Sequence, residues 1–177
     1  MGLSKGGRSS IQSKVQKLLS PLPENLRNTL YLRVFSLMQI PVLFFIRPKV
    51  LRVDEKGCTV VIPLNRRTKN HLGCMYFGVL ACGADIAGGL VAMKAIDESG
   101  EKISLIFKDF QAQFLKRVEG DCHFVSDDAD RVKALVQEAI QTGDRVETSV
   151  SVVAHVPGVL DEPAATFQLT LSLKKKS

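Results

Sequence analysis

The chain has 177 residues, which is about one domain. Apolar residues make up 45% of it and charged residues 24%, so it can form a packed core and is not a disordered polymer. Thirteen Gly and seven Pro are too few for a collagen-like or low-complexity chain. The net charge is +6, and it is uneven: residues 1–52 carry nine Lys and Arg against one acid, whereas residues 53–177 carry 15 basic and 17 acidic residues. This N-terminal excess indicates a solvated face, or a surface for a polyanion such as nucleic acid, anionic lipid or nucleotide phosphates.

The N-terminal segment indicates a basic arm without a secretory signal. The first twenty residues contain no acid and no continuous apolar stretch, which argues against a secretory signal, although a transit peptide stays open. We expect residues 1–23 to form a basic arm with helical character from Ile11 to Leu19. It shows no helix-turn-helix pattern, so no nucleic-acid partner is predicted.

A helix is predicted from about Glu24 to Ile40, where Pro41 ends or kinks it. Its apolar residues recur at spacings of three and four and form one stripe, made of Leu26, Leu30, Val34, Leu37 and Met38. The run from Val34 to Ile46 is the most apolar of the chain, but it is shorter than the about 20 residues that span a bilayer. We therefore predict a buried or interfacial helix and no membrane span.

Two short strands and a loop follow. From Lys49 the apolar period changes to two, which predicts strands over residues 50–54 and 58–64, joined by a turn at 55–57. Residues 65–73 are polar and are predicted to form a loop. After them, residues 76–94 are almost all apolar or small and suit a helix of about five turns that is buried on most sides. One acid, Asp85, stands in its middle.

The rest of the chain is predicted to form four strands and one helix, because apolar and polar residues alternate along most of it. Residues 102–118 predict a long strand with a phase slip near Lys108 and Asp109, which indicates a bulge. A short strand is predicted over residues 122–125, a helix from Asp127 to Gln141 that ends at Gly143, and two more strands. Those two strands span residues 145–156 and 166–173.

This order of elements indicates the α+β class. We expect an antiparallel β-sheet wrapped around a long central helix, with an extra N-terminal helix. No internal repeat is present, so residues 24–177 are predicted to form a single domain after the arm.

The cysteines point to a reduced compartment. There are four, and none forms a C-x-x-C pair: Cys58, Cys74, Cys82 and Cys122. His71 and Cys74 have no second ligand pair at metal-site spacing, so no metal is expected. We therefore predict a cytoplasmic protein with free thiols.

The central segment resembles a known superfamily. Residues 70–78 read Asn-His-Leu-Gly-Cys-Met-Tyr-Phe-Gly, and Asp85 follows seven residues later. This pattern is similar to the loop-to-helix entry of the PaaI-like acyl-CoA thioesterases of the hot-dog fold, and closer still to their DUF4442 branch. Residues 114–121, Phe-Leu-Lys-Arg-Val-Glu-Gly-Asp, also resemble the strand and turn that follow in these proteins. The resemblance covers about residues 30–173, and it departs from the PaaI pattern where Tyr76 stands in the place of a His.

The resemblance implies hydrolysis of acyl-CoA without a cofactor. The backbone N–H of Phe77 or Gly78, at the helix start, would act as an oxyanion hole. Asp85 would be the general base or nucleophile, because an apolar helix raises the pKa of a carboxyl. The alternative for Asp85 is a structural acid that pairs with an Arg or caps a backbone group.

Substrate contacts are also implied. Asn70, Gly73 and Tyr76 would position substrate or water, although Asn70 and the glycines also suit simple turn geometry. Basic residues would bind the phosphates of coenzyme A: Arg66, Lys116 and Arg117, with Arg67 and Lys69 beside them.

Other functions stay open at this point. One is a non-catalytic acyl-thioester-binding protein with the same pocket, and another is a structural or interaction module. A hydroxyacyl-thioester dehydratase would pair His71 with Asp85, but alignment of residues 78–80 with that family puts Lys69 in the place of the His. Hot-dog proteins assemble as dimers or tetramers with sites between subunits, so the resemblance implies a homodimer or homotetramer.

Overall fold

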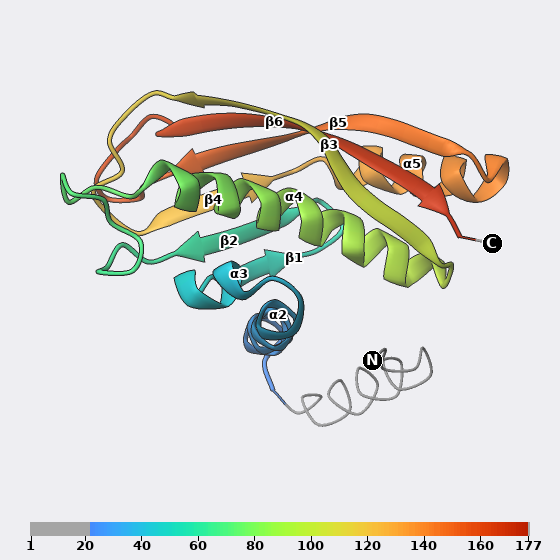
Figure 1. Cartoon of the computed structure of the whole chain (residues 1–177), viewed down its shortest axis with the longest axis horizontal. Coiled ribbons are helices and arrows are strands. Elements are labelled where there is room, and N and C mark those ends of the chain that lie inside the picture. Colours follow the sequence, from blue (N-terminus) through green and yellow to red (C-terminus); the bar gives the residue numbers. More distant parts are fainter. Residues whose placement is uncertain (1–21, 177) are drawn as a thin grey trace.

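The computed structural model describes residues 22–176, which fold as one sheet and four helices (Figure 1). The predicted arm, including the helix expected from Ile11 to Leu19, lies outside the described residues except for its last two positions. The helices are α2 (Glu24–Gln39), α3 (Pro41–Ile46), α4 (Phe77–Ser99) and α5 (Ala129–Thr142). The strands are β1 (Lys49–Val53), β2 (Cys58–Ile62), β3 (Ile103–Phe114), β4 (Cys122–Ser126), β5 (Arg145–His155) and β6 (Ala165–Lys175).

The six strands form one sheet in the order β1-β2-β4-β5-β6-β3, and every neighbouring pair is antiparallel. The sheet curls around α4, which lies along its inner side (Figure 1). The predicted α+β arrangement of an antiparallel sheet around a long central helix is therefore confirmed, and so is the helix before it. The predicted bulge is also present, because the pairing of β3 with β6 shifts between Phe107 and Asp109.

Helix α4 is the centre of the core. Its buried face consists of small and branched residues, including Val79, Gly83 and Ala87. Gly83 lies directly against the buried ring of Phe124 on β4, where a Cβ atom would fall well inside van der Waals contact. Helix α5 packs against α4 and β5, and it ends where Gly143 takes the left-handed conformation (φ +71°), as predicted.

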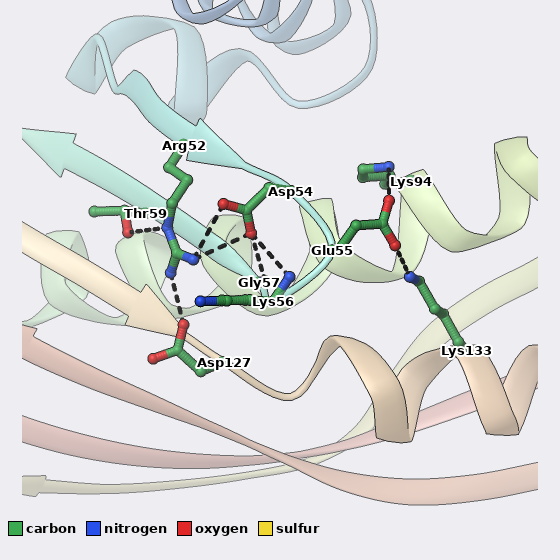
Figure 2. A network of polar contacts seen from close by, with 9 residues as sticks. All are labelled: Arg52, Asp54, Glu55, Lys56, Gly57, Thr59, Lys94, Asp127 and Lys133. Carbon is green, nitrogen blue, oxygen red and sulfur yellow. Dashed lines mark hydrogen bonds and ion pairs between the residues drawn. The ribbon is translucent and has the colours of Figure 1, made fainter.

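Charged side chains connect the hairpin of β1 and β2 to α4 and α5 (Figure 2). Arg52 forms ion pairs with Asp54 at 3.1 Å and with Asp127, just before α5, at 2.6 Å. Glu55 pairs with Lys94 of α4 and Lys133 of α5. Exposed pairs of this kind add little stability, so we interpret the network as fixing the orientation of the hairpin.

Helix α2 differs from expectation in the face that it buries. It packs against β1, where the N–H of Val50 donates to Thr29 Oγ1 at 2.9 Å, and its fully buried residues are Leu32 and Ser36. The apolar stripe predicted from the spacing does not form the buried face of α2. Four of its five residues are exposed, and Leu30 is half-buried. Pro41 ends α2, as predicted, but it also begins the separate helix α3, which the sequence did not indicate.

One helix among the described residues, α4, is long and apolar enough to cross a membrane. It lies in the core against the sheet, as a buried helix of a globular domain does. A membrane span is therefore not indicated in the part of the chain that the structure describes.

Candidate active site

The candidate site begins at the N-terminus of α4. Tyr76 stands at the N-cap in an extended conformation, and its N–H donates to the Thr68 carbonyl at 2.8 Å. The preceding residue, Met75, donates to the carbonyl of Val118 at 2.8 Å. These two bonds fix the start of the helix to the loop before it and to the segment after β3.

The first turn of α4 carries free backbone donors. The N–H groups of Val79 and Leu80 donate to the Tyr76 carbonyl. Those of Phe77 and Gly78 have no acceptor among residues 22–176, as expected for the first positions of a helix. They point outward along the axis at the positive end of the helix dipole. Such donors can polarise a carbonyl group and stabilise the oxyanion that forms from it.

Aromatic rings surround these donors. The ring of Tyr76 lies 4.7 Å from that of Phe77, and Phe77 meets the ring of Phe114, at the end of β3, edge-on at 6.3 Å. All three side chains are exposed. The Tyr76 ring also covers Gly78, where a Cβ would come within 2.5 Å of its Cε1 atom. The helix start therefore offers a polar centre beside an apolar surface.

Asp85 lies in the middle of α4 and is half-buried. Its carboxylate has no hydrogen bond or ion pair with any described residue. Burial raises the pKa of Asp85, and it also raises the pKa of the neighbouring Cys82 thiol, with a further rise from the Asp85 charge. A raised pKa does not single Asp85 out, because burial raises the pKa of Asp97 on the same helix as well.

Asp85 shares a face of α4 with the helix start. Gly78, Cys82, Asp85 and Gly89 recur at spacings of four, three and four, and all four are half-buried. Seven residues separate Gly78 from Asp85, which corresponds to about 10 Å along the axis. Because the first-turn N–H groups point away from Asp85, one carbonyl cannot contact both within a single chain.

The turn before α4 uses its own polar groups. Asn70 Oδ1 accepts the N–H of Leu72 at 2.9 Å, and Asn70 Nδ2 donates to Cys74 Sγ at 3.3 Å. Gly73 takes a left-handed conformation (φ +83°), and its N–H donates to the Asn70 carbonyl at 3.1 Å. The Asn70 carboxamide therefore shapes the turn, and Gly73 supplies a conformation that other residues rarely adopt.

The three basic residues expected to bind phosphate lie in two loops near the helix start. Arg66 belongs to the loop after β2, and Lys116 and Arg117 follow β3. The N–H of Leu64 donates to Asp121 Oδ1 at 2.9 Å, which joins these loops. Lys116 pairs with Glu162 at 3.2 Å, whereas Arg66 and Arg117 pair with no acid among residues 22–176.

The structure adds Phe114 to the candidate site. The sequence predicts only that this residue belongs to the strand of residues 102–118 and to the segment 114–121 that resembles the strand and turn of the superfamily. Among the described residues, no group of three His, Cys, Asp or Glu side chains is arranged to hold a metal ion.

Comparisons with known proteins identify the family and the fold. A family model described as a domain of unknown function, DUF4442, matches residues 29–159. No curated protein is similar to this chain in sequence.

Several solved structures are similar. A protein of unknown function from Chlorobaculum tepidum has a TM-score of 0.74 at 13% identity, over 86% of this chain and 97% of its own. A Pseudomonas aeruginosa protein, described as a probable thioesterase, has a TM-score of 0.70 at 22% identity, over 88% of this chain and 97% of its own. A thioesterase family protein from Silicibacter pomeroyi has a TM-score of 0.62 at 17% identity, over 84% and 99%. At these identities the likeness shows a common fold, the hot-dog fold.

Proposed function

The chain belongs to the DUF4442 family and has the hot-dog fold, and from this premise we propose that it hydrolyses acyl thioesters, with acyl-CoA as substrate. Of the similar solved structures, one is described as a probable thioesterase and one as a thioesterase family protein, which supports this reaction class. The observation that carries it is the combination on α4 of an unpartnered, half-buried carboxylate and a helix start with free N–H groups.

The reaction needs two copies of the chain. In one chain, Asp85 lies about 10 Å along the axis from the first-turn N–H groups, so a second copy supplies the other half of each site. The N–H groups of Phe77 and Gly78 in one copy donate hydrogen bonds to the thioester carbonyl oxygen and so draw electron density from the carbonyl carbon. Asp85 of the second copy faces the same carbonyl carbon through a water molecule.

The chemical steps then follow from the roles of these groups. The Asp85 carboxylate takes a proton from water while the water oxygen bonds to the carbonyl carbon. The resulting oxyanion is stabilised by the Phe77 and Gly78 N–H groups. When the oxyanion collapses, the carbon–sulfur bond breaks, and the departing thiolate takes the proton from Asp85. The products are a carboxylic acid and a free thiol.

The surface of β3 supports a homodimer. β3 is an edge strand that pairs with β6 on one side only, and along it Ile106, Phe110 and Phe114 are exposed. A long, apolar, unpaired strand edge is a template for another strand. If two β3 edges pair antiparallel around a two-fold axis, the two α4 helices run antiparallel. The proposed site requires the register of this pairing in which each helix start lies opposite Asp85 of the other copy.

The remaining site residues have supporting roles. Tyr76, Phe77 and Phe114 give an apolar wall for the acyl group. Arg66, Lys116 and Arg117 lie at the same end of the molecule and attract the phosphates of coenzyme A. Asn70 and Gly73 hold the turn that presents the first N–H groups of α4. The cytoplasmic location predicted from the free thiols fits a substrate of this class.

The test is release of free thiol from short, long and aromatic acyl-CoAs by wild type and by the Asp85→Asn variant. Loss of a general base is expected to lower the rate by about 10²–10⁴. Asp97→Asn is the matched control, because Asp97 lies on the same helix and its pKa is also raised by burial. Asp97→Asn is expected to keep the wild-type rate.

Two results would contradict the assignment. Equal rates for wild type and Asp85→Asn would place the base elsewhere. If wild type releases no thiol while acyl-CoA still raises its melting temperature, the protein binds acyl thioesters without hydrolysing them.

A further inference from the structure

Helices α2 and α3 lie beyond β1, away from the rest of the molecule (Figure 1), and together they present an exposed apolar surface. Helix α3 consists of the six residues Pro-Val-Leu-Phe-Phe-Ile and buries only Leu43 and Ile46. The α2–α3 face is defined by the exposed side chains of Val34, Leu37, Met38, Val42, Phe44 and Phe45. More than half of the surface of Met38 and Phe45 is accessible, at 57% and 56%. Helices α2 and α3 pack against each other, and a group of exposed apolar side chains on neighbouring helices is typical of an interaction site.

Three arginines lie beside this face. Arg33 Nε donates to the carbonyl of Pro48, next to Arg47, at 3.2 Å. The guanidinium of Arg67 lies over the ring of Phe45, 5.9 Å from its centre. The pKa of Arg33 is lowered by burial and then by the charges of Arg47 and Arg67, so Arg33 lies close enough to both cations to be repelled by them.

These arginines have no acidic partner among residues 22–176. Arg52, in contrast, lies on the next strand and is paired with two carboxylates (Figure 2). An unneutralised group of three guanidinium ions is stabilised when it binds anions, and guanidinium geometry suits phosphate oxygens.

Bulky apolar side chains with a cationic border are the pattern of a surface that lies in the boundary between water and an anionic bilayer. We propose that the α2–α3 face docks on anionic phospholipid membranes. Phe45, Val42 and Met38 enter the acyl boundary, and Arg33, Arg47 and Arg67 bind the phosphate groups of the lipids.

Charge complementarity favours a membrane over the two other occupants that this chain could provide. In a symmetric contact between two copies, the α2–α3 face of one copy meets the same face of the other, so two surfaces that each carry three unneutralised arginines oppose each other and repel. The N-terminal arm carries Lys5, Arg8, Lys14 and Lys17 and no acid, so it is also repelled. An anionic lipid surface attracts both the face and the arm.

The face is connected to the start of α4 by a short path. Arg67 directly precedes Thr68, whose carbonyl accepts the N–H of Tyr76 at 2.8 Å. Docking through Arg67 therefore places the loop that begins α4 near the membrane surface, where long acyl chains partition. Membrane docking does not depend on thioester hydrolysis, and it is tested without any measurement of activity.

The experiment is co-sedimentation of the full chain with vesicles of phosphatidylcholine alone, and of phosphatidylcholine mixed with phosphatidylglycerol. Binding is expected only to the anionic vesicles, and it is expected to fall when the salt is raised from about 0.1 M to about 0.5 M. The Arg47→Gln/Arg67→Gln variant should bind about 30-fold more weakly, since each cation near the surface contributes about 1 kcal/mol. Its control, Lys56→Gln/Lys102→Gln, removes two exposed cations elsewhere and should bind as wild type does.

The apolar contribution is tested by Val42→Ser/Phe45→Ser. Both side chains are more than half exposed, so the fold should be kept, which circular dichroism checks. Binding is expected to fall at least about tenfold, because two apolar side chains no longer enter the boundary. Val159→Ser, at an exposed position in another loop, is the matched control.

Four outcomes would overturn the proposal. One is no binding of wild type to anionic vesicles at the lower salt concentration. A second is wild-type binding by both Arg47→Gln/Arg67→Gln and Val42→Ser/Phe45→Ser, together with loss of binding when the four arm cations are changed to Gln. That result would assign the contact to the arm. A third is a smaller assembly of Val42→Ser/Phe45→Ser in analytical ultracentrifugation without vesicle binding by wild type, which would assign the face to a second copy. The fourth is binding only to an anionic protein.

Discussion

The environment of Asp85 disfavours the ionised form of its carboxyl group. It is half-buried on an apolar helix, has no partner among residues 22–176, and its pKa is raised by burial. A buried acid whose folded pKa lies above its unfolded pKa of about 3.9 stabilises the fold while protonated. That contribution is complete below the unfolded pKa and is lost as the pH rises through the folded pKa. At neutral pH the ionised Asp85 therefore lowers the free energy of unfolding.

We expect Asp85→Asn to raise the melting temperature at about pH 8 and to leave it nearly unchanged at about pH 3.5, where wild-type Asp85 is protonated in both states. The same titration governs the proposed reaction. kcat/KM of wild type should fall with decreasing pH at a higher pH than the pKa of an ordinary Asp, because the base must be ionised. Thermal melts and pH–rate profiles check both statements. A lower melting temperature of the variant at pH 8 would show that Asp85 has a stabilising structural role.

The candidate site residues are predictable from the sequence to an unequal degree. The lone acid in an apolar helix and the Gly-containing helix start drew attention to Asp85 and Gly78, because both are unusual in a buried segment. The part of Asn70 in its own turn is visible only in the hydrogen bonds of its carboxamide. The sequence does not indicate that Arg33 and Arg47 lie near Arg67, because their proximity depends on how α2 and α3 fold back on the loop that carries Arg67.

At the scale of the element, α4 shows how small residues set the packing of the core. A Cβ at Gly83 would overlap the ring of Phe124, which has no room to move because it is fully buried. A Cβ at Gly89 would lie 3.8 Å from Phe107, which is ordinary contact. The packing of the core therefore requires a glycine at position 83, whereas the space at Gly89 would accept an alanine side chain.

We predict that Gly83→Ala lowers the free energy of unfolding by about 3 kcal/mol through overpacking. Gly89→Ala is the matched variant and should raise it by about 0.5–1 kcal/mol, because Ala costs less conformational entropy in a helix. Urea denaturation of both variants measures the difference. Equal stabilities would mean that β4 and α4 can separate without cost.

The elements were predictable where local periodicity decides them. The buried helix α4, the bulge in β3 and the glycine end of α5 each follow from a pattern within the element. The orientation of α2 does not, because the spacing shows that a stripe exists but not what covers it. The face of α2 that packs on β1 carries Thr29 and Ser36. A hydrogen bond from the N–H of Val50 to Thr29 Oγ1 stabilises this orientation of the helix.

At the scale of the whole molecule, the proposed site requires two chains, and this can be tested by mixing. Phe77→Pro removes one first-turn N–H while Pro suits the first helical position. Phe77→Ala is its control, because it loses the ring and keeps the N–H. We expect Phe77→Pro to be about 10²–10³ slower than Phe77→Ala.

Neither Asp85→Asn nor Phe77→Pro should be active by itself. When the two variants are mixed in equal amounts, dissociated and reassociated, half of the dimers are heterodimers. Each heterodimer has one site with Asp85 from one copy and the intact helix start from the other. About a quarter of the wild-type activity should then return. No recovery in a mixture that ultracentrifugation and mass spectrometry show to contain heterodimers would place both groups in the same chain.

The strand order also determines when the molecule becomes complete during synthesis. β6 lies between β5 and β3, yet it comes later in the chain than both of them. Until residues 165–175 have been made, β3 has no partner, Phe114 has no Phe167 to pack against, and one side of the apolar helix α4 stays uncovered. Non-local pairing of this kind is slow, and the nascent chain exposes apolar surface while it waits. A ribosome that pauses before β6 would thus hold the domain in its most aggregation-prone form.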